Sequence, residues 1–364
     1  MLEEFIKNHI AVSSLESPDH ALRKDPNIIS VTWFMGKRCN YDCSYCTSYY
    51  HDNWSPHIEK NKSFNFIDQL EEYTVSQGKK FKLVISGGEP FVHPDFFKIL
   101  NHIKEKETLT QLSVVTNGSL PLKTYIKSSN YLTNIIISLH LEQPDNTIDV
   151  TVNKIIELNK LNWFLNVNLM ALPGKFDKIK NIIEKFKTNK IKFVLRKIDP
   201  PFEDKEDFVK KGDTKGIEVA EKDFLKNKLI KVVKQSEGLY ARWEQYYSKE
   251  ELNFLSTYEN TEQWENIRLH SSDDILERNT DELKLKGLNA WKGWQCYIGI
   301  DSLYIQHNGM LFRGNCMQGE PLGQIGEIIS WPNKPLSCPL ERCLCNGDMI
   351  VRKYKNKEGR TKIE

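Results

Sequence analysis

Long apolar runs are missing from this chain of 364 residues, and neither sign of charge dominates it. No stretch approaches the roughly 20 apolar residues that span a bilayer. The first residues include acidic side chains and no apolar segment, which argues against a secretory signal peptide. Because 51 basic residues face 49 acidic ones, the net charge of +2 gives no general reason to expect binding to nucleic acid or to a membrane. These absences predict a soluble, cytoplasmic protein.

Cysteine is absent between residues 47 and 295, and this gap divides the eight cysteines into two groups. The groups are Cys39, Cys43 and Cys46, and then Cys296, Cys316, Cys338, Cys343 and Cys345. A disulfide scaffold is typical of short secreted chains, and neither description applies here. Clustered thiols in a reducing compartment indicate metal ligands instead.

Short apolar runs alternate with amphipathic segments in the first half of the chain. Strands are predicted at 29–35, 81–85, 112–115, 135–139, 164–170 and 191–195. Helices are predicted at 64–75 with Ser63 as N-cap, and at 94–103, 121–128, 148–161 and 176–186. This alternation predicts a parallel sheet covered by helices on both faces. Six strand–helix units are too few for a closed eight-stranded barrel, so we expect an α/β fold built on a partial (βα)6 TIM barrel.

Candidate functional residues follow the predicted strands at their C-terminal ends. In strand order they are the cysteine loop, Gly87-Gly88-Glu89-Pro90, Thr116-Asn117-Gly118, Ser138 with His140, Met170, and Arg196. Because the C-terminal ends of barrel strands meet at one rim, we expect these residues to share a site.

Four domains are predicted from the changes in composition. Residues 1–28 form an N-terminal extension and 29–198 the barrel, and 199–290 form a mainly helical insert rich in Lys and Glu. Residues 291–364 form a small unit with a hairpin turn at His307-Asn308-Gly309 and a short helix after 323–329. The insert has helical spacing at Leu225 and Leu229, and its Arg242 and Trp243 are candidate contacts for a small polar molecule.

The spacing C-x3-C-x2-C at Cys39, Cys43 and Cys46 resembles the signature of the radical S-adenosylmethionine (SAM) superfamily. Three thiolates can hold three irons of a [4Fe–4S] cluster and leave the fourth iron open. The resemblance implies that this iron chelates the amino and carboxylate groups of SAM. The aromatic Tyr45 directly before the third cysteine also fits the family pattern.

The segment Gly87-Gly88-Glu89-Pro90 resembles the second motif of the same family. Two glycines let the backbone approach a ligand, and the resemblance implies that Glu89 accepts hydrogen bonds from the SAM ammonium. It also implies SAM contacts from the other rim residues, namely Thr116, Asn117, Ser138, His140, Met170 and Arg196. Each has an alternative interpretation: a tight turn for the glycine segments, a structural role for the histidine, and a surface salt bridge for the arginine. No residue is assigned as catalytic.

The second cysteine group resembles the SPASM/Twitch extension of radical SAM enzymes, a hairpin and helix that hold auxiliary [4Fe–4S] clusters. Five cysteines suit one cluster, as in the shorter Twitch form, and four of them would complete its ligation. The spare thiol is Cys338 or Cys345 in this interpretation. The spacing differs from the family pattern, because Gly309 lies seven residues before Cys316 rather than five. A structural zinc site of four cysteines is the alternative, since zinc and iron–sulfur clusters share this ligation.

The function implied by the resemblance is reductive cleavage of SAM to a 5′-deoxyadenosyl radical, which abstracts hydrogen from an unactivated carbon of the substrate. A flavodoxin- or ferredoxin-type donor would supply the electron. Modification of a ribosomally made peptide is the first expectation, because most relatives with this extension do so. Oxidation of a sugar, an aminocyclitol or another small polar metabolite is the alternative. A non-enzymatic iron–sulfur or zinc protein would explain the cysteines but not the Gly87–Pro90 segment.

Overall fold

The computed structural model describes residues 20–22, 27–46, 51–161, 163–198, 246–258, 266–270, 275–280, 283, 289–343 and 345–355. The sequence features at Leu225, Leu229, Arg242 and Trp243 lie outside these described residues.

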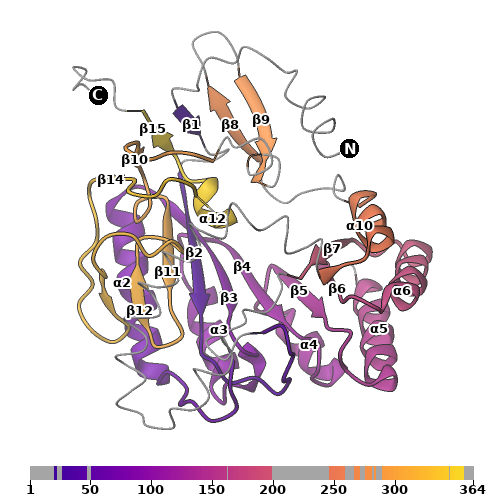
Figure 1. Ribbon diagram of the computed structural model, residues 1–364. Helices are drawn as coiled ribbons and strands as arrows, with labels where there is room; N and C mark the ends of the chain where they lie inside the picture. Colours follow the sequence, from indigo (N-terminus) through magenta and orange to yellow (C-terminus); the bar gives the residue numbers. More distant parts are fainter. Residues whose placement is uncertain are drawn as a thin grey trace, which may run out of the picture.

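A parallel sheet of six strands forms the body of the protein (Figure 1). Its strands, in spatial and sequence order, are β2 (Ile28–Phe34), β3 (Lys80–Ser86), β4 (Leu109–Thr116), β5 (Asn134–Leu139), β6 (Phe164–Ala171) and β7 (Phe193–Lys197). The helices between them are α2 (Lys60–Ser76), α3 (Phe96–Lys104), α4 (Leu122–Ser128), α5 (Asp145–Asn159) and α6 (Phe176–Thr188). The predicted α/β fold with the parallel sheet of a partial barrel is confirmed.

The hydrophobic core lies between one face of this sheet and the helices. In β2 the buried residues Ile29, Val31 and Trp33 alternate with partly exposed ones, and α2 buries Phe66 against Trp33 with their ring centroids 5.9 Å apart. Buried residues of α2 to α6 belong to one continuous cluster with the same face of the strands. The sequence predicted helices on both faces, and this was wrong for α2 to α6, because successive crossovers on a curved sheet pack on its outer side.

Four helices begin at different residues from those predicted. Helices α4 and α5 begin at 122 and 145 rather than at 121 and 148. The N-cap of α2 is Glu59, so Ser63 lies inside the helix, where its hydroxyl is 3.2 Å from the Glu59 carbonyl oxygen. Helix α3 begins only at Phe96, because the chain first forms the 3-10 turn η1 (Pro90–Val92), and Pro94 therefore precedes the helix.

Three further strands extend the barrel sheet beyond β2 to a total of nine. Strand β11 (Ser302–Ile305) pairs in parallel with β2, and β12 (Met310–Phe312) and β13 (Gly323–Gln324) follow in antiparallel pairs. The predicted turn joins β11 to β12, and Gly309 adopts the left-handed φ of +86° there. The short helix expected after residues 323–329 forms only at α12 (Asn346–Met349), and the strand at 336–337 precedes it.

A second sheet contains six short antiparallel strands. Their spatial order is β14 (Leu336–Ser337), β10 (Gln295–Cys296), β15 (Lys353–Tyr354), β1 (His20–Leu22), β8 (Asn266–His270) and β9 (Ile275–Asn279). The described parts of the range 199–290 include β8, β9 and the helix α10 (Lys249–Ser256), so that range is not helical throughout. The division into four domains stays a prediction.

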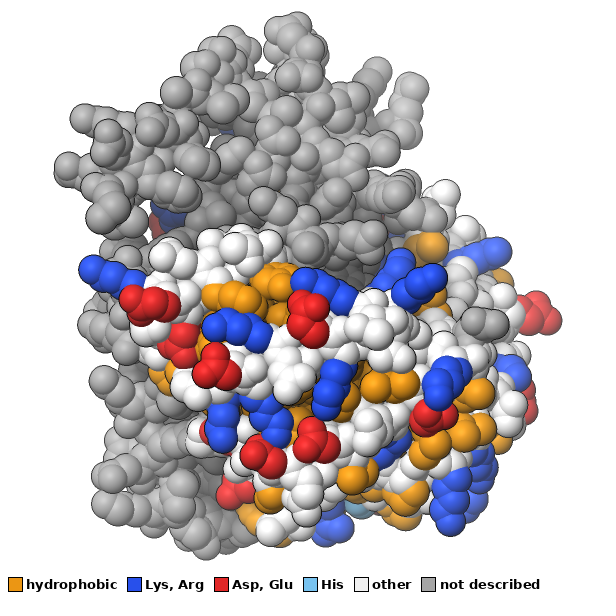
Figure 2. Space-filling model, turned by 90° about the vertical axis from the view of Figure 1, so that its right-hand side faces the viewer, with side chains coloured by type: hydrophobic (Ala, Val, Ile, Leu, Met, Phe, Trp, Pro, Cys, Tyr) orange, Lys and Arg blue, Asp and Glu red, His pale blue; other side chains and the backbone are white. Residues whose placement is uncertain are grey.

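Charged side chains of both signs are interspersed with apolar ones on the face shown in Figure 2, which carries α5 and α6. Ion pairs such as Lys178 with Asp145 join the two helices there. In the described part of the chain, no helix combines the length and apolar character needed to cross a membrane.

Candidate cofactor site

The loop that carries the first three cysteines is docked on the glycine segment after β3. The Gly88 amide donates to the Gly36 carbonyl oxygen at 2.9 Å, and the Glu89 amide donates to the Arg38 carbonyl oxygen at 2.7 Å. A Cβ on Gly88 would lie 2.2 Å from the Arg38 oxygen, and one on Gly87 would lie 2.6 Å from the Gly36 oxygen. The two glycines therefore allow the segment after β3 to contact the backbone of the cysteine loop. The sequence predicted only that they let the backbone approach a ligand.

Glu89 is a buried brace between the ends of β3 and β4. Its side chain accepts hydrogen bonds from the Phe91 amide at 3.2 Å and the Asn117 amide at 2.7 Å, and the Thr116 hydroxyl lies 2.8 and 2.9 Å from its two oxygens. Burial raises the pKa of Glu89 to about 7, against the lowering effect of these hydrogen bonds. Its predicted contact with the SAM ammonium stays a prediction.

Asn117 extends this network to the first cysteine. Its amide nitrogen donates to the Asn40 side-chain oxygen at 2.9 Å and lies 3.7 Å from the Cys39 sulfur. The Ser119 amide donates to the Asn117 side-chain oxygen at 2.9 Å, which fixes the orientation of the amide group. An N–H group aimed at a cysteine sulfur is one of the features that tune a thiolate-ligated cluster.

The far side of the cysteine loop is fastened to the end of β5. The Tyr45 hydroxyl lies 2.5 Å from His140 Nδ1, and the two rings are stacked with their centroids 5.9 Å apart. Glu142 accepts hydrogen bonds from both the amide and the hydroxyl of Ser44. Burial lowers the pKa of His140 to about 4 and raises the pKa of Tyr45, so both rings are neutral at pH 7.

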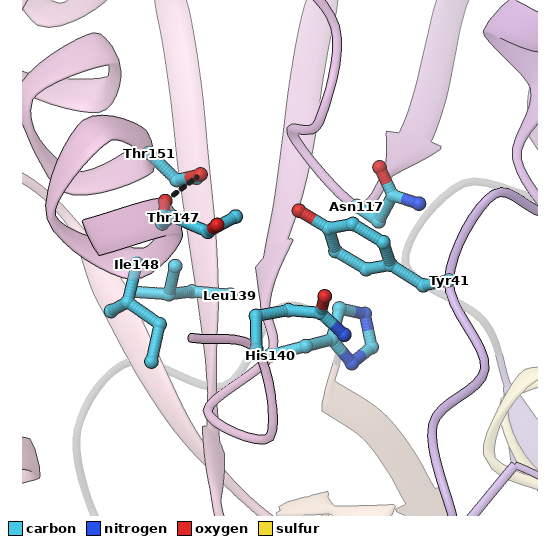
Figure 3. A pocket seen from close by; sticks show the side chains of 8 residues that line it. Tyr41, Asn117, Leu139, His140, Thr147, Ile148 and Thr151 are labelled. Carbon is cyan, nitrogen blue, oxygen red and sulfur yellow. Dashed lines mark hydrogen bonds between the residues drawn. The ribbon is translucent and has the colours of Figure 1, made fainter. Parts of the chain in front are cut away.

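A narrow pocket lies between the cysteine loop and the start of α5 (Figure 3). Tyr41 reaches into it from the cysteine loop, and its ring centroid lies 6.2 Å from that of His140. The lining residues are Tyr41, Asn117, Leu139, His140, Gln143, Thr147, Ile148 and Thr151. Sequence reasoning missed Tyr41, Glu142 and Thr151. The available signal was their position, because Tyr41 lies inside the cysteine motif and Glu142 follows His140 by two residues.

Ser138 and Arg196 belong to a polar row that crosses three neighbouring strands. The Asn168 side chain connects them, since its nitrogen lies 3.5 Å from the Ser138 hydroxyl and its oxygen accepts from Arg196 Nε at 3.3 Å. Met170 and Arg196 are paired in the register of β6 and β7. The row alternates with the buried residues of these strands, so it lies on the face opposite the helices.

The three cysteines of the loop are partly or fully buried thiols. Burial raises the pKa of Cys39 and raises that of Cys43 to about 12, and the negative charges of Glu142 and the other two cysteines add to the effect at Cys43. The thiolate forms are therefore unfavourable unless a cation is bound. This donor chemistry fits a thiolate-ligated cluster.

The five later cysteines are also thiols, and they include Cys296 on β10 and Cys345 at the N-cap of α12. Cys296 packs with Cys316 and Cys338, and Cys343 packs against Trp291 and Trp294. Burial raises the pKa of all four of these cysteines, and Cys345 adds repulsion at Cys316 and Cys343. Which four of the five are ligands stays a prediction.

Over the described ranges, no three side chains of Cys, His, Asp or Glu are close enough together to hold one metal ion. A tetrahedral zinc ion needs four ligands around one point, whereas each thiolate of a [4Fe–4S] cluster binds a different iron. For the second cysteine group, both the cluster and the zinc alternative stay predictions.

Comparison with known proteins places these residues in a family. Residues 33–210 match the model of the radical SAM superfamily. A GTP 3′,8-cyclase from Campylobacter lari is 31% identical over 206 residues, which cover 53% of this chain and 59% of that protein.

Two solved structures resemble the fold at low identity. Streptococcus suis SuiB has a TM-score of 0.45 and 14% identity, over 81% of this chain and 62% of SuiB. The protein anSMEcpe with bound AdoMet has a TM-score of 0.46 and 13% identity, over 83% of this chain and 79% of its own. The chain thus spans less than two thirds of the length of the cyclase and of SuiB. The family match covers the cysteine loop and the glycine segment docked on it, and residues 33–210 are thus those of a radical SAM domain.

Proposed function

We propose that this protein binds a [4Fe–4S] cluster through Cys39, Cys43 and Cys46 and cleaves SAM reductively at its open iron. The observation that carries the proposal is the backbone contact between the cysteine loop and Gly88–Glu89, because it joins the two family motifs at one rim. When bound, the cluster and SAM supply a 5′-deoxyadenosyl radical that abstracts hydrogen from the substrate, with an electron from a flavodoxin- or ferredoxin-type donor.

The chain's own residues position these groups and keep water away. Asn117 directs an N–H group at the Cys39 sulfur, and the neutral rings of Tyr45 and His140 form a wall beside the loop. Glu89 holds a carboxylate at the end of β3, at the place where the family motif faces the SAM amino group. Arg196 lies in the polar row on the inner face, where a polar substrate would meet the rim.

A peptide is the substrate class we propose first. The support is the second cysteine group, because relatives with a SPASM/Twitch-like extension largely modify ribosomally made peptides. A small polar metabolite is the second candidate, and the polar row of Ser138, Asn168 and Arg196 favours it. A peptide would bind along the rim by its backbone, whereas a small metabolite would depend on Arg196 for most of its charge recognition.

Anaerobically reconstituted protein is expected to release 5′-deoxyadenosine when dithionite and SAM are added. The measurement is chromatographic quantification of 5′-deoxyadenosine against a sample without dithionite. A cluster spectrum without any 5′-deoxyadenosine would contradict the proposal and favour an electron carrier. Repeating the assay with a candidate peptide or metabolite, and with Arg196→Lys, separates the two substrate classes.

We propose that the second cysteine group binds an auxiliary [4Fe–4S] cluster. The combined change Cys39→Ala, Cys43→Ala and Cys46→Ala removes the first set of ligands. The variant is expected to lose 5′-deoxyadenosine formation and to retain about four irons per chain. Metal analysis checks this, and zinc in place of iron would overturn the auxiliary cluster while leaving the first one standing.

A further inference from the structure

Lys353 is a lysine buried in the middle of the second cysteine group. The residue is 1% exposed. Its nitrogen lies 2.6 Å from the Asp348 carbonyl oxygen, 3.1 Å from that of Met349 and 2.8 Å from that of Val351. An ammonium group has three N–H donors, and a neutral amine has two. Three carbonyl acceptors therefore match the charged form. The Trp291 ring adds a cation–π contact, with its centroid 4.4 Å from the nitrogen.

The charge of Lys353 faces the cysteine sulfurs. Lys353 on β15 is the register partner of Cys296 on β10, so both side chains leave the sheet on the same side. Its positive charge opposes the rise that burial causes in the pKa of Cys296, Cys338 and Cys343. The electrostatic field of one lysine therefore reaches three of the five thiols.

Lys353 is hydrogen-bonded to backbone carbonyls, whereas the nearby carboxylate of Asp348 accepts hydrogen bonds from backbone amides. One Asp348 oxygen accepts from the Asn315 amide at 3.0 Å and the other accepts from the Cys316 amide at 2.6 Å. A Cβ on Gly314 would lie 2.6 Å from the first oxygen, so the turn before Cys316 is shaped around this carboxylate. Asp348 thus holds the Cys316 turn, and its charge also raises the pKa of Cys296, Cys338 and Cys343, where the charge of Lys353 lowers it. Lys353 is therefore the cation that offsets this buried carboxylate at the sulfurs.

We propose that Lys353 is a positioning residue that raises the reduction potential of a cluster held by the C-terminal cysteines. The inference rests on the auxiliary cluster of the proposed function. A thiolate-ligated cluster gains negative charge on reduction, so a fixed cation beside it stabilises the reduced form. The low dielectric of the buried site strengthens this effect.

The test uses the full chain with Cys39, Cys43 and Cys46 replaced by Ala, so that only the second cluster is present. Lys353→Met keeps an unbranched side chain, one atom shorter, and removes the charge, whereas Lys353→Arg keeps the charge. A redox titration followed by electron paramagnetic resonance is expected to give a more negative midpoint potential for Lys353→Met. Lys353→Arg should stay near the parent. Lys292→Met, at a lysine that is largely exposed on the same part of the chain, is the control and should cause no shift.

The outcomes distinguish the role of Lys353 from the presence of the second cluster and from SAM cleavage. An unchanged potential in Lys353→Met with full iron content overturns the role of Lys353 and leaves the cluster in place. A parent protein without a second cluster overturns both, while 5′-deoxyadenosine formation by the wild type still stands on its own. If Lys353→Met loses the cluster, retention of the cluster by Lys353→Arg supports the need for the charge. Loss of the cluster in both variants shows a requirement for shape alone and overturns the inference.

Discussion

Gly88→Ala is expected to lose the iron of the first cluster and to form almost no 5′-deoxyadenosine. The added Cβ would lie 2.2 Å from the Arg38 carbonyl oxygen and 2.3 Å from the Lys37 carbonyl oxygen. Both contacts are with backbone atoms, so no side-chain rotation relieves them. The cysteine loop must move away and give up its hydrogen bonds from the Gly88 and Glu89 amides. Metal analysis, together with the 5′-deoxyadenosine assay, measures the loss.

Gly78→Ala is the matched control for this change. Gly78 has a left-handed φ of +59°, and nothing lies within 4 Å of its Cβ position. The substitution therefore adds backbone strain of about 1 kcal/mol without a collision. It should lower the thermal midpoint slightly and leave the iron content unchanged. Full iron and unchanged activity in Gly88→Ala would show that close docking of the two loops is not required.

The sheet and its rim were predictable because their signals are local. Each strand of the barrel is a short apolar run followed by a break, and the parallel order follows from the helices between them. The same logic placed Thr116 and Glu89 at neighbouring strand ends, where the structure brings them within hydrogen-bond distance. Ser63 was misplaced because a serine suits both an N-cap and the first turn of a helix.

The attachment of β11 to β2 could not be predicted from local patterns. Residues 302–305 pair with 30–33, and the residue pattern of neither segment indicates that it pairs with the other. An edge strand exposes unpaired backbone groups, so a segment that covers the edge of β2 was to be expected. Local sequence did not indicate which segment this is. The backbone contact between Arg38 and Gly88 has the same origin, since only the folded chain reveals which two loops meet.

Glu89→Gln is expected to remove a pH dependence of stability between about pH 4.5 and 7. The ordinary pKa of 4.5 applies to the unfolded chain, and burial raises the folded value to about 7. The folded protein thus keeps a proton that the unfolded chain releases, so this contribution to stability is fully present below pH 4.5. It is lost as the pH rises through 7, by roughly 3 kcal/mol in all. Denaturant unfolding of the cluster-free, reduced protein across this range measures it.

The same substitution separates the brace from the proposed SAM contact. Gln retains an oxygen for the Asn117 amide but carries no charge, so the iron content should be retained while SAM binds more weakly. Glu142→Gln is the control, because its carboxylate contacts Ser44 on the other side of the loop. Unchanged SAM affinity in Glu89→Gln, measured by equilibrium binding to the reconstituted protein, would leave Glu89 as a structural brace alone. Weakened SAM binding with full iron would make it a ligand for the SAM ammonium group, because loss of the brace would disturb the docked cysteine loop and its cluster as well.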